Sequence, residues 1–467
     1  MLAFHFTHID NLESILVHGL LSTNLKNKMA VEHQNVANNY IQQTRSQIII
    51  DNDLKLRRKS DIWLATQIKH NLHDFVPFYF AYKCPMLFQI LTTKNIDQSD
   101  IIFIAIDAKK CLAELNDSYF SDCSINRLHN LPNLYSNEAD LEKLNWAEIR
   151  NLKGVAGNDN LKQQRMAEFL IKDRVLPNYI EKIIVWNNDV KQKITDLYNN
   201  KNVEPPKMEY AETGHHYYLE PENLFGGRAW SQSAVLGPRA LLSKLVEYYQ
   251  KTLDEHKKNK EDCNYKFRFK NLSEMYSAMI RETTVLPEVA DAYSLKMNYG
   301  YHKSTVQEHS CRVHKNLHDL KEFRSLNAND QLIAKLASLL HDIGKGPASR
   351  WKNSEMTRPD FNHSARSLAM LLRIFSSEIE ELTEDEVAKI FVCVTYDDLI
   401  GEIVGKGRDK QQLFKLVDSA DSADIVNLLF AIGKADMKDV HEPWLEEHEA
   451  ALDTLYKEAI QRVEQNA

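Results

Sequence analysis

In the second half of the chain, one histidine, a His-Asp pair and a single aspartate lie far apart in the sequence, in segments where separate helices are expected. These residues are His309, His341-Asp342 and Asp436, in the segments QEHS, LLHDIGKG and KADM. Imidazole nitrogens and carboxylate oxygens together suit a divalent transition metal, which makes a hydroxide-like nucleophile from water near neutral pH. The spacing therefore predicts a hydrolytic metal centre.

The length and composition indicate a globular protein with more than one domain. A chain of 467 residues can bury two or three separate cores, and 43% apolar and 27% charged residues are ordinary values. The net charge of -8 excludes binding of nucleic acid through bulk positive charge, although a local basic patch stays open. The six cysteines form no CxxC pair, so neither a disulfide framework nor a zinc knuckle is expected.

The start of the chain, MLAFHFTHID, has no signal-peptide pattern. No apolar stretch approaches the roughly 20 residues that span a bilayer. We therefore expect a cytoplasmic protein that has no membrane partner.

The first 219 residues mix strand and helix patterns. Short β-branched runs indicate buried strands, and apolar residues at helical spacing indicate helices. The expected elements are strands at 101–106 and 183–186, a helix at 11–20 that stops near Gly19, a helix at 160–174 that carries Glu168, and a polar flap or loop at 22–60.

A border between two domains is expected near residues 199–230, where Asn-rich, Pro-Pro and Gly-Gly segments follow one another. We place the domains at 1–219 and 220–467, with a linker near 220–230. From about residue 230 onward, long amphipathic helix patterns dominate, which predicts an all-α second half. A helix at 332–340 would deliver the His-Asp pair at its end.

The region 228–467 resembles the HD-domain phosphohydrolases in its Glu308-His309 and HDIGKG segments. The resemblance implies that His309, His341, Asp342 and Asp436 hold a divalent metal, which could be Mn, Fe, Mg, Co or Zn. His363 matches a later histidine that such enzymes use in a binuclear site or on the phosphate. Where relatives show paired histidines, this chain has Asp397-Asp398, so one metal, two metals or a purely regulatory domain all stay open.

Two stretches of the first half are unusual. They are FHFTHIDNL at 4–12 and LHDFVPFYF at 72–80. From the residues alone, such an aromatic run is more often core than pocket, and Glu168 would pass as a helix surface residue. No GxGxxG follows a strand, so an ordinary dinucleotide-binding fold is not indicated.

Together with YFSD, QRMAE and HHYYL further along, these stretches resemble the DarT family of DNA ADP-ribosyltransferases over residues 1–219. The resemblance implies an α+β ADP-ribosyltransferase fold, a split mixed sheet with helices, and NAD in a cleft. It also implies roles for single residues: Thr7, His8, Asn11, Phe78 and Tyr79 at the cofactor, Arg58 or Arg57 on its phosphate and base, and Glu168 in catalysis. The family's TD element commonly continues with a histidine, whereas this chain has Ser121-Asp122-Cys123-Ser124.

The expected activity is transfer of ADP-ribose from NAD to a base in single-stranded DNA, as in a toxin or anti-phage effector. Cleavage of the nicotinamide–ribose bond builds positive charge that a carboxylate stabilises, and single-stranded DNA offers its bases without unpairing. An antitoxin or ADP-ribosyl hydrolase encoded nearby would be a partner. The alternatives are an RNA or protein acceptor, or an NAD-sensing module that controls an HD nucleotide hydrolase. The HD domain would modulate the transferase or act on nucleotides.

Overall fold

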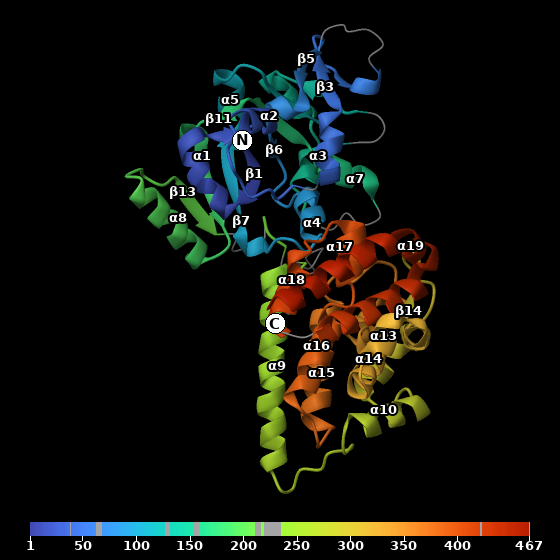
Figure 1. Ribbon diagram of the computed structural model, residues 1–467. Helices are drawn as coiled ribbons and strands as arrows, with labels where there is room; N and C mark the ends of the chain where they lie inside the picture. Colours follow the sequence, from blue (N-terminus) through green and yellow to red (C-terminus); the bar gives the residue numbers. More distant parts are fainter. Residues whose placement is uncertain are drawn as a thin grey trace. The chain divides into compact units, whose positions relative to one another are not determined.

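The chain forms two compact units, Met1–Val235 and Leu236–Ala467. The computed structural model describes residues 1–37, 39–61, 68–126, 131–152, 158–210, 216–218, 235–420 and 423–466 (Figure 1). The expected border at 219/220 and the linker near 220–230 fall within residues 219–234, outside the described residues.

The first unit is built on a mixed eight-stranded sheet in the order β13-β12-β7-β1-β6-β10-β8-β9 (Figure 1). The strands are β1 (Leu2–His8), β6 (Phe75–Tyr79), β7 (Ile101–Asp107), β8 (Ser118–Ser121), β9 (Leu134–Tyr135), β10 (Glu168–Lys172), β12 (Ile180–Val185) and β13 (Lys207–Tyr210). Neighbouring strands run antiparallel except β12 and β13, which are parallel. The run at 101–106 is thus confirmed as strand, and the run at 183–186 is confirmed up to Val185, where β12 ends.

The sheet is nearly divided between its two central strands. β1 pairs with β7 from Leu2 to His8, but it meets β6 at the single register pair of Phe4 and Tyr79. Because β1 and β6 are paired at only one position, side chains can lie between the two strands beyond it. This confirms the expected split mixed sheet.

The expected helix at 160–174 is wrong. Helix α7 (Asp159–Gln164) ends early, and Glu168 begins β10, which pairs with β6 on one side and β8 on the other. The run Phe169-Leu170-Ile171 is buried on both faces of the sheet. Aromatic and β-branched residues favour such a central strand, and this preference outweighs the helical pattern that precedes it.

The expected loop at 22–60 is also wrong, because this polar segment is structured. It contains α2 (Thr23–Lys28), α3 (Asn39–Ser46), β3 (Ile48–Asp51) and β4 (Leu56–Arg58), and β3 pairs with β4 and with β5 (Ile68–Asn71). Ile48 and Ile50 of β3 pack into a hydrophobic cluster, and this packing stabilises the small sheet. The expected helix at 11–20 is confirmed as α1 (Leu12–His18), which ends at Gly19 with φ +80°.

The tyrosine-rich motif HHYYL lies near the end of the first unit. Its described residues, 216–218, are not in a strand. The Tyr217 hydroxyl donates to the Ile101 carbonyl at 2.6 Å, and the Tyr218 hydroxyl donates to the Cys84 carbonyl at 3.0 Å. Both phenols are buried, so the motif closes the core through side-chain hydrogen bonds rather than through a strand ladder.

The second unit is almost entirely helical, as expected. Its helices are α9 (Pro238–Glu261), α10 (Leu272–Arg281), α11 (Pro287–Tyr293), α12 (Val306–Asn316), α13 (Lys321–Ser325), α14 (Ala328–Leu340), α15 (His363–Ser377), α16 (Glu384–Thr395), α17 (Leu399–Lys406), α18 (Gln411–Ala420) and α19 (Ala423–Asn466). Two short strands, β14 (Lys296–Met297) and β15 (Glu355–Met356), pair in parallel. Within the described part of the chain, no helix is both long and apolar enough to cross a membrane.

The loop after α14 packs tightly on α15. The Gly344 amide donates to Ser367 Oγ at 2.9 Å. A Cβ at Gly344 would lie 2.0 Å from the His363 carbonyl oxygen and 2.5 Å from the Ser367 nitrogen. The absence of a side chain at Gly344 therefore sets the distance between the His341-Asp342 pair and α15.

We predict that Gly344→Ala destabilises the helical unit by about 3 kcal/mol, because backbone atoms of α15 must move to admit the methyl group. Differential scanning calorimetry of the full chain measures this. The transition of the helical unit should fall in temperature while that of the first unit stays in place. Unchanged melting of both units would contradict the close packing.

Candidate functional site

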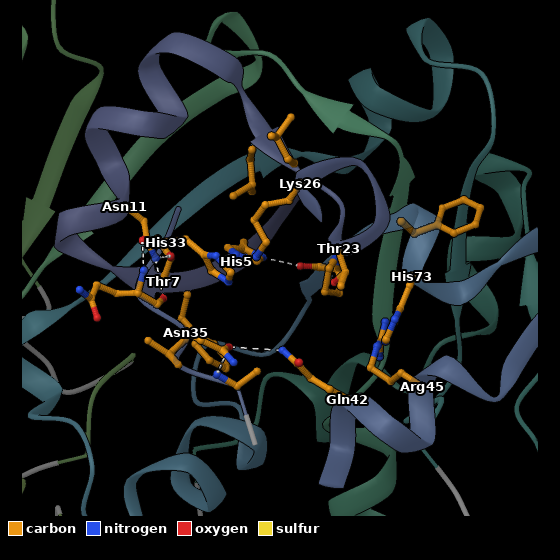
Figure 2. Close-up of a pocket in the computed structure, with 18 of the residues that line it drawn as sticks. His5, Thr7, Asn11, Thr23, Lys26, His33, Asn35, Gln42, Arg45 and His73 are labelled. Atoms are coloured by element: carbon orange, nitrogen blue, oxygen red, sulfur yellow. Dashed lines mark hydrogen bonds between the residues drawn. The ribbon is translucent and has the colours of Figure 1, made fainter. Parts of the chain in front are cut away.

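A cavity in the first unit opens beside the split between β1 and β6 (Figure 2). Polar and apolar side chains from both strands, from α3 and from the segment 33–37 line it together. The residues that matter below are His5, Thr7, Asn11, Lys26, Gln34, Asn35, Gln42, Arg45, Pro77, Tyr79 and Asn126. A concave, mostly apolar wall with a few polar groups is typical of a small-molecule site.

Asn11 fastens one wall of the cavity. Its Oδ1 accepts from the Gln34 amide at 2.7 Å, and its Nδ2 donates to the Gln34 carbonyl at 2.9 Å and to Thr7 Oγ1 at 3.0 Å. Gln42 Nε2 on α3 donates to Asn35 Oδ1 at 3.3 Å (Figure 2). Two residues of the opening sequence motif, Thr7 and Asn11, therefore shape the cavity.

Glu168 is completely buried beside the cavity and is held from three directions. Its Oε2 accepts from Arg45 Nη1 at 2.7 Å, and its Oε1 accepts from the Ile125 amide at 3.2 Å. Its own amide donates to Ser121 Oγ at 3.1 Å. Since Arg45 lines the cavity, the guanidinium connects the buried carboxylate to the space where a ligand would lie.

The charges at this point compensate one another. Burial lowers the pKa of Arg45. The charges of Glu168 and Tyr79 and the hydrogen bond to Glu168 raise it by a larger amount, so the net shift is upward. Burial raises the pKa of Tyr79 well above its usual range, and the Glu168 charge adds to this. The arrangement is a buried ion pair beside a neutral phenol. Removing one charge of such a pair costs about 3–5 kcal/mol, because the other stays buried without a partner.

Burial also lowers the pKa of two bases of the cavity. It lowers the pKa of His5 to about 4, while His5 Nδ1 lies 2.7 Å from the Pro77 carbonyl oxygen. Burial lowers the pKa of Lys26 to about 8. Figure 2 shows His5 and Lys26 on the same side of the cavity.

Asn126 brings an amide group to the cavity wall directly after Ile125, whose amide holds Glu168. Both polar atoms of the Asn126 side chain are shielded from solvent, and neither has a hydrogen-bond partner among the described residues. Such groups usually find a partner, so a bound molecule that offers a donor and an acceptor would satisfy them.

The structure brings only some of the predicted residues to this cavity. Tyr79, Thr7 and Asn11 line it, whereas His8, Phe78, Arg57 and Arg58 are not among its lining residues.

The four predicted residues that do not line the cavity lie elsewhere in the first unit. His8 Nδ1 accepts from the Asp10 amide at 3.2 Å, and Phe78 is packed in the core. Arg57 Nε donates to Asp51 Oδ2 at 2.8 Å on the exposed edge of β4, and Arg58 ends the same strand. The guanidinium at Glu168 belongs to Arg45, which the sequence reading missed because it lies in the segment interpreted as a loop.

In the second unit, the four residues predicted to hold a metal come together. His309 lies on α12, His341 and Asp342 follow α14, and Asp436 lies on α19. His309 Nε2 is 3.2 Å from His341 Nε2, 3.4 Å from Asp342 Oδ2 and 3.0 Å from Asp436 Oδ1. Ligand atoms bound to one metal at about 2.0–2.2 Å are separated by about 3–3.5 Å, so these spacings suit a shared ion.

The orientation of both imidazoles favours a metal. His309 Nδ1 lies 2.7 Å from Asp439 Oδ2, and His341 Nδ1 lies 3.0 Å from the Ser338 carbonyl oxygen. An acceptor at Nδ1 fixes the proton there and turns the Nε2 lone pair toward the cluster. Two imidazole nitrogens and two carboxylates that face one another form a donor set that fits a divalent metal.

Burial and neighbouring charges shift the pKa values of His309 and Asp342. Burial lowers the pKa of His309, but hydrogen bonds to Asp436 and Asp439 raise it to about 9. Burial raises the pKa of Asp342, but the charges of Lys345 and the nearby histidines hold it well below its usual range. Lys345 Nζ donates to Asp342 Oδ2 at 2.5 Å. Asp439, which the sequence reading missed, lies one helical turn after Asp436.

His363 continues the cluster on its other side. Its Nε2 lies 3.5 Å from Asp342 Oδ1 and 3.4 Å from Asp397 Oδ2. Three groups of potential ligands result, namely His309-His341-Asp436, His341-Asp342-Asp397 and His363-Asp397-Asp398. The carboxylates at the positions where paired histidines were expected therefore face the cluster.

Family models match both parts of the chain. Residues 4–219 match the family described as ssDNA thymidine ADP-ribosyltransferase, DarT, and residues 306–425 match the HD domain.

Two relatives resemble part of the chain. A DNA ADP-ribosyl transferase–DNA ADP-ribosyl glycohydrolase fusion protein of Thermosipho africanus is 26% identical over 209 residues, which is 43% of this chain and 46% of that protein. A DNA ADP-ribosyl transferase of Thermus aquaticus is 26% identical over 207 residues, which is 42% of this chain and 80% of that protein. This chain thus spans less than half the length of the fusion protein.

A solved structure also aligns with this region. Thermus sp. 2.9 DarT in complex with ADP-ribosylated ssDNA covers 46% of this chain and 96% of its own, with 24% identity and a TM-score of 0.39.

We predict that Asp439→Asn weakens metal binding about 10- to 100-fold, because the carboxylate no longer fixes the His309 tautomer. Titration calorimetry of Mn²⁺ into the full chain measures the change. Asp319→Asn is the matched control, since Asp319 is exposed and pairs with Lys438. Equal affinities in all three proteins would contradict the role of Asp439.

Proposed function

We propose that this chain, which joins a DarT ADP-ribosyltransferase domain to an HD domain, transfers ADP-ribose from NAD to thymidine in single-stranded DNA. NAD would occupy the cavity beside the split sheet. The observation that carries the proposal is the buried Arg45–Glu168 ion pair at the wall of that cavity. The identity of the base follows the description of the matching family, and the DNA-modifying relatives support it.

The reaction breaks the bond between nicotinamide and the ribose and forms a bond between that ribose carbon and an atom of the base. Positive charge builds on the ribose as nicotinamide leaves, and the Glu168 carboxylate stabilises this charge. The same carboxylate accepts the proton that the base loses. Arg45 keeps the carboxylate oriented and offers its guanidinium to the NAD phosphates, the role that the family resemblance gave to Arg58 or Arg57.

Asn126 is the group that we assign to the acceptor base. Its amide supplies one donor and one acceptor that lack partners among the described residues, close to the amide that holds Glu168. A base with a carbonyl oxygen next to an N–H group matches this pair. A single-stranded substrate presents these atoms without the cost of opening a duplex.

The two arginines provide a matched comparison. We predict that Arg45→Ala lowers transfer at least 100-fold, because the carboxylate loses its hydrogen-bonded cation, a loss of about 3 kcal/mol or more. Arg57→Ala, on the exposed strand, should keep full activity. Transfer is measured with labelled NAD and a thymidine-containing oligonucleotide. A strong loss in Arg57→Ala combined with normal activity in Arg45→Ala would contradict the assignment.

We also predict that Glu168→Gln abolishes transfer while the protein stays folded, because glutamine keeps the shape and one acceptor oxygen but not the charge. Glu168→Ala is less suitable, since it leaves Arg45 buried without a partner. Label that disappears with DNase supports the DNA acceptor. Label removed only by RNase or protease would favour the alternative acceptors, and NAD binding without any turnover would favour an NAD sensor.

For the HD unit, we propose that it binds a divalent metal through His309, His341, Asp342 and Asp436 and restrains the toxicity of the transferase. A bound metal would supply an activated water for hydrolysis of a phosphoester or diphosphate. ADP-ribose carries a diphosphate, so the transferred group is a suitable target. The Thermosipho relative is named as a fusion of a transferase with a glycohydrolase, which supports restraint of the transferase by the same chain.

The restraint has a genetic test. We predict that Asp342→Ala makes the chain more toxic on expression, because the carboxylate at the centre of the metal cluster is lost. Adding Glu168→Gln to the same chain should restore growth. Growth that is better in Asp342→Ala than in the wild type would show instead that the HD unit takes part in the attack, as an effector that acts on nucleotides.

A further inference from the structure

An exposed tyrosine stands at the tip of a turn in the HD unit. Tyr301 is 67% exposed, the largest fraction among the exposed large hydrophobic side chains of the described residues. The turn lies between β14 and α12, and the His302 amide closes it by donating to the Tyr299 carbonyl at 3.0 Å. A tyrosine ring that a tight turn holds in solvent offers a flat apolar face to another molecule.

The residue after Tyr301 anchors this turn to the metal cluster. The His302 ring meets the ring of His309 edge-on, with centroids 5.7 Å apart and an angle of 80° between the planes. The Tyr299 ring packs on His302 at 4.8 Å. Since His309 is one of the proposed metal ligands, these contacts fix the turn, and with it Tyr301, beside the cluster.

The Tyr301 ring is stacked on an imidazole of α19. Its plane lies at 23° to that of His441, with centroids 4.0 Å apart. The shielded Nδ1 of His441 has no hydrogen-bond partner among the described residues, so we attribute the orientation of this imidazole to the ring contact. His441 follows Asp436 by five residues, about 7.5 Å along a helix. The stack therefore stands close to the cluster on the side of α19 as well.

Lys406, the last residue of α17, adds an ammonium near the same carboxylates. Its Nζ lies 3.4 Å from Glu402 Oε1, but Glu402 is already paired with the buried Arg408 at 2.9 Å. Burial lowers the pKa of Lys406, and the charges of nearby carboxylates, Asp398 first, raise it by a larger amount. Asp436 is among these carboxylates. Once a metal neutralises the cluster, this ammonium can pair with a phosphate group.

We propose that Tyr301 and His441 form a stacking platform for an adenine base, and that the phosphate attached to its ribose lies at Lys406 and the metal cluster. The ligand is the adenosine phosphate end of the ADP-ribosyl group. The inference thus rests on the function proposed for the HD unit and names the part of the group that this unit recognises. Stacking of a base needs an open aromatic face and no particular hydrogen bond, and Tyr301 provides such a face.

The test is photolabelling of the full chain with 8-azido-AMP, because the labelled peptide reports where the base lies. Trypsin releases the two parts of the platform as Met297–Lys303 and Asp439–Lys457. Both peptides should carry label in the wild type. AMP should compete with the label, whereas ribose 5-phosphate, which lacks the base, should not compete at the same concentration.

Two substitutions at one position separate stacking from packing. Tyr301→Leu keeps an apolar side chain over His441 but removes the ring, so labelling of both peptides should fall about 10-fold at a low probe concentration. Tyr301→Phe is the matched control and should keep the label, because its ring remains. Calorimetric melting should show that the helical unit stays folded in both variants, and titration should show that both still bind Mn²⁺.

The outcomes distinguish the platform from the metal centre. Label confined to the first unit, equal labelling of Tyr301→Leu and the wild type, or loss of label in Tyr301→Phe would each overturn the platform. Label on the platform of a chain that binds no Mn²⁺ would overturn the metal centre and leave the platform in place.

Discussion

The register between β10 and β6 is the constraint on which the candidate site of the first unit depends. It places Glu168 opposite Tyr79, at the point where β6 separates from β1. Because side chains alternate across a sheet, a shift by one residue would turn the carboxylate to the other face. The register therefore determines that Glu168 meets Arg45 at the cavity, and the small sheet of β3, β4 and β5 adjoins the helix that supplies this arginine.

The two units use buried charge in different ways. In the first unit, a single arginine pairs with a single carboxylate, and the second terminal nitrogen of Arg45, Nη2, has no hydrogen-bond partner among the described residues. In the second unit, the carboxylates of Asp342, Asp397, Asp398 and Asp436 lie in neighbouring groups of potential ligands, and the ammonium of Lys345 contacts Asp342. The first arrangement places one guanidinium at the wall of a cavity, whereas the second gathers donors that suit divalent cations.

Much of this organisation follows from the sequence, because it depends on local patterns. The apolar runs predict β7 and β12, Gly19 predicts the end of α1, and the HD segments identify His309 and His341 before any contact is known. Motifs of this kind carry their information within a few neighbouring residues. The same local reasoning wrongly extended a helix through Glu168, because pairing on both sides of β10 is a tertiary effect.

The residues that the sequence did not indicate act across long separations. Arg45 meets Glu168 only after the sheet has formed, and nothing in the segment around it marks it as different from Arg57 and Arg58. Asp397 stands where relatives show paired histidines, and only the fold shows that it lies close to His341 and Asp342 in a group of potential ligands. For both Arg45 and Asp397, the neighbours of the side chain follow from its place in the fold and not from its residue type.

The most direct test is to digest an oligonucleotide to nucleosides after incubation with NAD and the full chain, and to analyse the products by mass spectrometry. We expect ADP-ribosylated thymidine in the wild type and unmodified nucleosides with Glu168→Gln. Nicotinamide release without any modified nucleoside, or a modified nucleoside formed equally by both proteins, would contradict the assignment of Glu168 in a DNA-modifying site.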